Sequence, residues 1–146
     1  FLLQQLFNEG GRFFWIHNTG PIGCLPRKNM MNKLTSEDLD FVGCRKNENE
    51  IAQEFNNQLK DIVFQLRKNF TNAIFTYVDV YSAKYELIKN ARNQGKDPSK
   101  YISWDGVHYS EAANKWLSTL IVNGSFSHPL LATGMLASQS PKHILG

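Results

Sequence analysis

An aspartate and a histidine three positions apart are the residues of this chain best suited to chemistry. They are Asp105 and His108, in the stretch WDGVHYS at 104–110. A carboxylate that accepts a hydrogen bond from one imidazole nitrogen fixes the tautomer of the ring, so that the other nitrogen can take a proton from a nucleophile. Gly106 allows a tight turn between them, and Trp104 is placed to cover the carboxylate. The spacing fits two members of a catalytic triad.

Other roles for this pair stay open from the spacing alone. A D-x-x-H pair also occurs as a surface aspartate beside a histidine packed at a helix start. Metal binding is disfavoured because no other His, Cys or carboxylate pair stands in a ligand-like register, so we expect no metal and no cofactor. The sequence contains neither G-D-S nor G-x-S-x-G as a nucleophile motif. Ser103 and Ser110 flank the pair on the same loop, and we expect neither to be presented to His108.

The composition excludes several classes of protein. The chain has 146 residues, enough for one domain, and a 42% hydrophobic share argues against disorder. Its 16 basic and 13 acidic residues give a net charge of +3 without a long basic run, so we expect no nucleic-acid or anionic-membrane partner. No stretch approaches 18 uncharged apolar residues, so we expect no membrane span.

Segments with the hydrophobic pattern of a strand alternate along the chain with segments that have the pattern of a helix, which predicts an α/β fold. The strand segments are rich in aromatic and β-branched residues, and the second is apolar on both faces, as in a parallel sheet. Ser110 is expected to cap the last helix. The predicted elements are strands at 12–18 and 72–81 and helices at 46–70, 82–92 and 111–124.

The helical periodicity also predicts which faces are buried. The opening residues FLLQQLFNEGG look like the last turns of a helix stopped by Gly10 and Gly11, so we expect the chain to be a fragment. Residues 126–146 show no period and are predicted to form a C-terminal extension. The core faces are expected to comprise Ile51, Phe55, Leu59, Ile62, Val63, Leu66 and Phe70 on the first long helix, and Ala112, Trp116, Leu117, Leu120 and Ile121 on the last.

Two cysteines stand about twenty residues apart at the ends of one long loop. Cys24 and Cys44 could both be free and buried, or could close the loop as a disulfide in a secreted protein. Two N-glycosylation sequons, at Asn69 and Asn123, favour the secretory pathway. We therefore predict a Cys24–Cys44 disulfide.

Several segments taken together resemble the plant GDSL esterase/lipase family, a part of the SGNH hydrolases, in its early-nodulin-like and acetylesterase-like branch. These are FFWIHNTGPIGCLP, FNNQLKDIVFQLRKNF, IFTYVDVYSAKYELI and WDGVHYSEAANKWLSTLIVNG. The resemblance implies a secreted plant ester hydrolase, with Asp105 as triad acid and His108 as general base, acting on a small-molecule, lipid or acetylated ester. It also implies a three-layer α/β/α SGNH-hydrolase-like fold with a flavodoxin-like parallel sheet, of which 1–125 would be the C-terminal part, the N-terminal half being incomplete.

The sequence departs from the family pattern in ways that bear on activity. The GDS nucleophile block, the oxyanion-hole glycine and the G-x-N-D asparagine are all missing, and Asn18 in NTGP is expected to shape a loop instead. Only a short stretch separates Gln94 from Trp104, where the family has a few dozen residues. We therefore expect the chain alone to be inactive. The alternatives are a non-catalytic truncated relative that serves as a binding or interaction protein, and an incomplete gene product.

Overall fold

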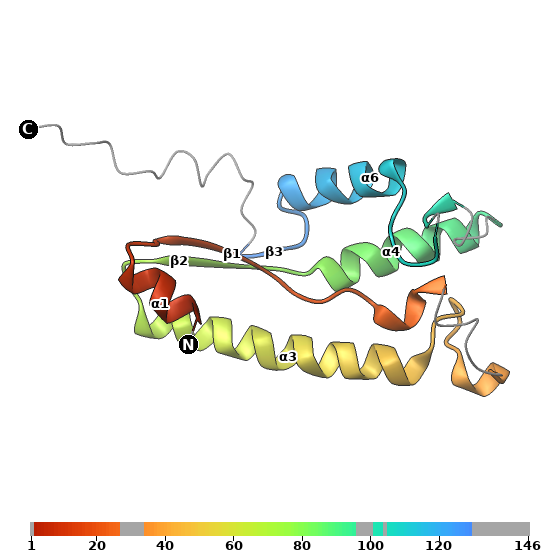
Figure 1. Ribbon diagram of the computed structural model, residues 1–146, viewed down its shortest axis with the longest axis horizontal. Coiled ribbons are helices and arrows are strands. Elements are labelled where there is room, and N and C mark those ends of the chain that lie inside the picture. The colour runs from red at the N-terminus through yellow and green to blue at the C-terminus, as the bar shows by residue number, and fades with distance from the viewer. Residues whose placement is uncertain (1, 27–33, 96–100, 104, 130–146) are drawn as a thin grey trace, which may run out of the picture.

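A three-stranded sheet forms the centre of the computed structural model, which describes residues 2–26, 34–95, 101–103 and 105–129 (Figure 1). The strands are β1 (Phe13–His17), β2 (Ile74–Val78) and β3 (Ser127–His128), in the order β1-β2-β3. β1 and β2 are parallel, as expected, whereas β3 pairs with β2 in the antiparallel sense. The sheet is therefore mixed, and the expectation of a purely parallel sheet is wrong at the β3 edge.

The direction of β3 follows from the two helices that precede it. α4 (Val80–Asn93) continues beyond the sheet in the direction of β2, and α6 (Glu111–Val122) runs back along α4 toward the sheet (Figure 1). The chain then turns at once into β3, so it re-enters the sheet against the direction of β2. These first residues of the predicted C-terminal extension thus belong to the sheet.

The four predicted helical segments are confirmed, with shifted ends. α1 (Leu2–Asn8) is followed by Gly10 at a φ of 98°, and α3 (Lys46–Asn69) connects β1 to β2. The side chain of Ser110 caps α6 by accepting a hydrogen bond from the backbone N–H of Ala113 at 3.3 Å. The second strand is shorter than predicted because Asp79 caps α4 and ends β2 at Val78. In the described part of the chain, no helix is long and apolar enough to cross a membrane.

Two hydrophobic clusters hold these elements together. The first fills the space between α3 and one face of the sheet, where Val63, Phe75 and Tyr77 are buried and the rings of Phe14 and Phe75 stack 4.7 Å apart. The second joins α4, α6 and the loop that precedes α3. It comprises Val42, Cys44, Ile88, Ile102 and Ala113, with Cys24, Tyr85, Leu87, Ala91 and Tyr109 packed against them.

The buried face of α3 differs from the predicted stripe. Val63 is fully buried, but Ile51, Phe55 and Ile62 are 60%, 55% and 49% exposed, so the prediction is wrong for the N-terminal half of this helix and for Ile62. That half instead turns Asn49 and Asn56 inward. Both amides hydrogen-bond to the backbone of the loop that follows β1, which compensates for burying polar groups.

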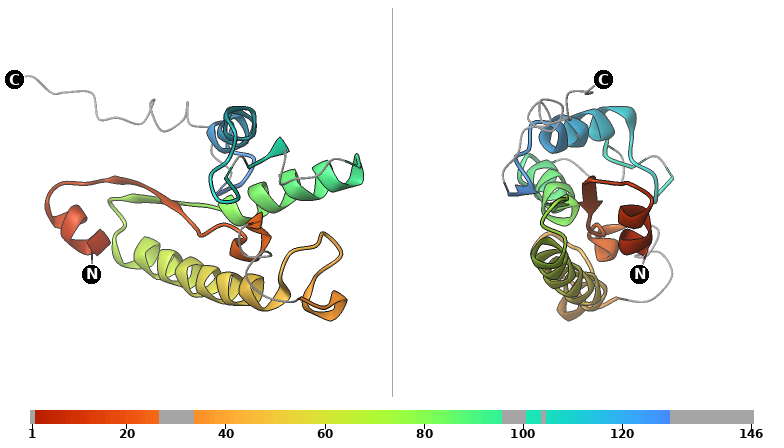
Figure 2. Two further views of the ribbon diagram at one scale, coloured as in Figure 1. Left: turned by 45° about the vertical axis from the view of Figure 1, so that its right-hand side comes forward. Right: turned by 90° about the vertical axis from the view of Figure 1, so that its left-hand side faces the viewer.

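The buried face of α6 is also narrower than predicted. Leu117 is buried as expected, and its partner on that face is Ala113 rather than Ala112. Trp116 is 36% exposed and, with Ala112, lines an open cavity between α6 and α4 instead of the core. α3 and α6 lie on opposite sides of the strands in all three views (Figures 1 and 2).

Candidate active site

Asp105 and His108 lie side by side on the loop that leads into α6. The His108 Nδ1 atom is 2.5 Å from Asp105 Oδ2. Asp105 Oδ1 accepts the backbone N–H groups of His108 and Val107 at 2.7 and 2.9 Å, and Gly106 allows this turn with a φ of 82°. The carboxylate therefore fixes both the backbone and the ring of His108.

The charge of Asp105 determines which imidazole nitrogen carries a proton. Hydrogen bonds from the His108 side chain, and then from the backbone N–H groups of His108 and Val107, lower the pKa of Asp105 to about 2. The carboxylate is therefore ionised near neutral pH, and His108 Nδ1 must donate the proton between them. A neutral ring in this tautomer has Nε2 as its basic nitrogen, which is the state that a general base requires.

The loop that carries the pair is anchored mainly by the residues after His108. Ser110 N–H donates to the Ile102 carbonyl at 2.6 Å, and Ser103 forms an isolated β-bridge with Tyr109. The Tyr109 side chain packs against the second hydrophobic cluster, whereas the His108 side chain is 70% exposed. Trp104, which we expected to cover the carboxylate, lies outside the described residues.

Neither neighbouring serine is hydrogen-bonded to His108. Ser103 is 3% exposed, and its hydroxyl has no hydrogen-bond partner among the described residues. The Ser110 hydroxyl donates to the Tyr101 carbonyl at 3.2 Å and accepts from the Ala113 N–H as a helix cap. This agrees with the expectation that neither one is presented to the imidazole as a nucleophile.

Asn18 connects the carboxyl ends of both parallel strands. Its side-chain N–H groups donate to the Tyr77 hydroxyl and to Asp79 Oδ1, both at 2.9 Å, and its carbonyl accepts the Tyr81 N–H at 2.9 Å. The side chain is buried and all its polar groups are used. Asn18 is thus a loop-forming residue, as expected, with no N–H group left over for an oxyanion. The sequence signal for this network is an Asn directly after one strand and an Asp directly after the next.

Cys24 and Cys44 form a disulfide, with their Cα atoms 4.3 Å apart. The bond joins the short helix η1 (Ile22–Cys24) to the residues just before α3. Asn49 of α3 accepts the Gly23 N–H at 2.9 Å. Both cysteines pack in the cluster that contains Ile102 and Tyr109, so the disulfide belongs to the hydrophobic cluster that anchors the His108 loop.

Both sequon asparagines lie at the ends of helices and are exposed. Asn69 is the last residue of α3, and Asn123 follows α6. Asn123 Oδ1 accepts the N–H of Ser125 at 3.0 Å and its hydroxyl at 2.6 Å. The other histidines are elsewhere, because His17 ends β1 and His128 is in β3, while His143 lies outside the described residues.

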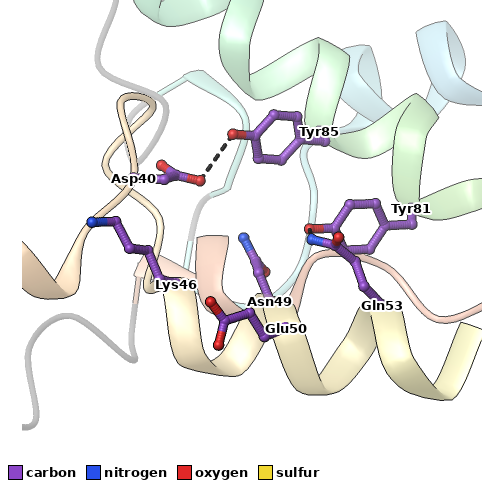
Figure 3. A pocket seen from close by; sticks show the side chains of 7 residues that line it. All are labelled: Asp40, Lys46, Asn49, Glu50, Gln53, Tyr81 and Tyr85. Carbon is purple, nitrogen blue, oxygen red and sulfur yellow. Dashed lines mark hydrogen bonds between the residues drawn. The ribbon is translucent and has the colours of Figure 1, made fainter.

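A polar cavity of about 400 Å³ lies between α3, α4 and the loop that precedes α3 (Figure 3). Its side chains pair with one another: the Tyr85 hydroxyl donates to Asp40 Oδ2 at 2.9 Å, and Gln53 donates to the Tyr81 hydroxyl at 2.7 Å. Burial, and then the hydrogen bond to Asp40, raise the pKa of Tyr85 well above its usual range. Neither Asp105 nor His108 lines this cavity. Within the described ranges, no three His, Cys, Asp or Glu side chains form a group that could hold a metal.

An imidazole oriented by an ionised carboxylate, in an α/β chain, is an arrangement that hydrolases with a serine nucleophile use. The chain belongs to the GDSL-like lipase/acylhydrolase family, whose model matches residues 2–121.

Curated plant relatives agree with this assignment. The maize (Zea mays) GDSL esterase/lipase ACHE is 38% identical over 172 residues, which cover 90% of this chain and 43% of the relative. An Arabidopsis thaliana GDSL esterase/lipase is 40% identical over 165 residues, covering 87% and 42%. The Medicago truncatula GDSL esterase/lipase ENOD8 is 35% identical over 164 residues, covering 87% and 42%. The chain thus spans less than half the length of these relatives. No solved structure matches it.

Proposed function

We propose that this chain supplies the acid and the general base of a Ser-His-Asp ester hydrolase. Asp105 is the triad acid and His108 the base, and the observation that carries this role is the 2.5 Å contact between Nδ1 and an ionised carboxylate. His108 Nε2 takes the proton of a serine hydroxyl as its oxygen attacks the ester carbonyl, and then returns this proton to the leaving alkoxide. Asp105 stabilises the imidazolium that exists between these two steps.

We place the serine and the oxyanion-hole donors in the part of a full-length relative that this chain does not cover. Two features support a domain with further elements in a three-layer α/β/α fold, of which 1–125 is the C-terminal part. β1 is the edge strand of the described sheet, with a row of backbone groups that face no other described strand. On the sheet face away from α3, Phe13 and Trp15 are 41% and 37% exposed. Further strands would pair with the edge of β1, and a further helix layer would cover this face.

The substrate class follows from this chemistry and from the family. We assign an ester, either a small molecule or a lipid or acetylated compound, because the relatives are named as esterases/lipases. The Cys24–Cys44 disulfide and the two exposed sequon asparagines support a secreted glycoprotein.

A chimera tests the proposed function directly. The N-terminal part of the maize relative, which this chain does not cover, is joined to residues 11–146 of this chain. We expect it to hydrolyse a short-chain aryl ester. His108→Ala should lower kcat by at least about 10³-fold, and Asp105→Asn should have a similarly large effect. His128→Ala, at another exposed histidine, is the matched control and should keep the activity.

The chimera also separates the two readings of the chain. A folded chimera without esterase activity, or with activity that His108→Ala leaves intact, would contradict the proposal. The first of these results would favour a non-catalytic binding protein. Circular dichroism and the elution volume on size exclusion show whether each chimera is folded before its activity is compared.

A further inference from the structure

Lys84 stands between the loop that follows β1 and the loop that carries His108. It belongs to the second turn of α4. Its Nζ atom is 4.9 Å from the centroid of the Tyr109 ring. On its other side, the Lys84 side chain lies against Gly20. A Cβ atom added to Gly20 would be 2.9 Å from Lys84 Cδ and 3.6 Å from Lys84 Nζ. Lys84 thus bridges two loops that are far apart in sequence.

The surroundings of this lysine differ from those of an ordinary surface lysine. Burial lowers the pKa of its ammonium below the usual value. No carboxylate of the described residues lies within salt-bridge distance of Nζ. The Tyr109 ring is therefore the group that interacts with this charge, and a cation gains more from an aromatic face when it is partly removed from water.

Tyr109, the residue next to His108, thus makes contacts on two sides. Tyr109 packs against the second hydrophobic cluster, and burial raises its pKa to about 12. Its carbonyl accepts a hydrogen bond from Asn114 at 3.1 Å. Lys84 covers the ring from the side of the β1 loop. The His108 side chain is largely exposed, and its backbone is joined directly to this anchored neighbour.

We propose that Lys84 is a positioning residue, which holds the His108 loop against the loop that follows β1 through its contacts with Tyr109 and Gly20. This inference rests on the proposed role of His108. Lys84 does not take part in proton transfer. It fixes Tyr109, and thereby keeps the His108 ring aligned with Asp105. Gly20 leaves room for the lysine, because a Cβ atom at this position would displace the Lys84 side chain.

The first test measures the tautomer of the His108 ring in the 146-residue chain. Nitrogen-15 NMR distinguishes the Nδ1–H from the Nε2–H tautomer, and the wild-type ring should be mainly Nδ1–H because Nδ1 faces the ionised Asp105. Lys84→Met keeps the length and removes the charge. We expect it to lower the ratio of Nδ1–H to Nε2–H by about threefold to tenfold, and Lys84→Arg to restore most of this loss.

A matched control exists on the same helix. Lys89 Nζ lies 5.9 Å from the centroid of the Phe41 ring, so Lys89→Met also removes a cation from an aromatic face. It should leave the tautomer ratio of His108 unchanged. If Lys84→Met likewise leaves the ratio unchanged, or if Lys89→Met shifts it equally, the proposed role of Lys84 is wrong.

Gly20→Ala keeps the proposal testable if Lys84→Met is poorly folded, and a double-mutant cycle with Lys84 tests the coupling. Gly20→Ala places a methyl group against a flexible side chain, so the lysine should move while the backbone stays. We expect Gly20→Ala to change the His108 tautomer ratio about threefold in the wild-type background and to leave it unchanged in a Lys84→Ala background. Equal shifts in both backgrounds would refute the coupling of Gly20 to His108 through Lys84.

The esterase chimera supplies a second readout. There Lys84→Met should lower kcat about fivefold with little change in KM, Lys84→Arg should recover most of it, and Lys89→Met should have no effect. An inactive chimera with the expected tautomer shifts would contradict the proposed function and leave the positioning role supported. An active chimera without these shifts would contradict the positioning role alone.

Discussion

Replacement of Asn18 by alanine should be among the most destabilising single changes in this chain. The side chain is 7% exposed and makes three hydrogen bonds, to the Tyr77 hydroxyl, Asp79 Oδ1 and the Tyr81 N–H. A buried hydrogen bond contributes a net 1 kcal/mol or so, so Asn18→Ala should lower the free energy of unfolding by about 3 kcal/mol. This is a large fraction of the roughly 5–15 kcal/mol that stabilises a typical domain.

Urea unfolding followed by circular dichroism measures this loss. The slope of the free energy against urea should stay constant while the midpoint falls, because the surface exposed on unfolding hardly changes. Asn57→Ala, at an exposed asparagine of α3, is the matched control and should change the free energy by no more than about 0.5 kcal/mol.

A second substitution at the same position tests the polarity of the network. Asn18→Asp keeps the oxygen that accepts the Tyr81 N–H but replaces the donor that faces Asp79 with a second carboxylate oxygen. We expect it to destabilise the fold at least as much as alanine does, and less at pH 4 than at pH 7, since protonation removes the repulsion. A loss below about 1 kcal/mol for Asn18→Ala, or a harmless Asn18→Asp, would refute this account of the network.

Three further predictions concern the disulfide and the Asp–His pair. Joint replacement of Cys24 and Cys44 by alanine should lower the free energy of unfolding in urea by about 3 kcal/mol, because the disulfide closes a loop with a sequence separation of 20; an unchanged midpoint would contradict this. Asp105 should titrate near pH 2 by carbon-13 NMR, and His108→Ala should raise its pKa toward the usual value. Because the folded pKa lies below the unfolded value of about 3.9, the stabilisation from Asp105 is complete above that pH and is lost as the pH falls through about 2. The chain alone should hydrolyse a short-chain aryl ester no faster than its own His108→Ala variant, and clearly faster hydrolysis by a pure sample would show that another group serves as nucleophile.

Elements with a long period or a specific cap could be predicted from the sequence. The strand with β-branched and aromatic residues after Gly11, the helix that starts at Lys46 and the cap at Ser110 each carry a local signal. The turn between Asp105 and His108 was predictable for the same reason, since a spacing of three positions with a glycine between them keeps the two side chains close together.

Features that depend on distant contacts could not be predicted in this way. Ile51 and Phe55 continue an apolar period, yet Asn49 and Asn56 face inward because the loop after β1 offers backbone groups to their amides. A strand of two residues, such as β3, is too short to show any period. The place of Lys84 against Tyr109 has no sequence signal, since it depends on how α4 leaves the sheet.

The inward-facing asparagines of α3 determine how this part of the fold can be exchanged between relatives. Asn56 donates to the Thr19 carbonyl and accepts its N–H, both at 2.9 Å, and Asn49 accepts the Gly23 N–H. The shape of the loop after β1 therefore depends on α3, a helix that begins after the second cysteine of the disulfide. Recombination between β1 and α3 would join a loop to a helix that cannot hold it, whereas a crossover at Gly10 and Gly11 keeps loop and helix together as one inherited module.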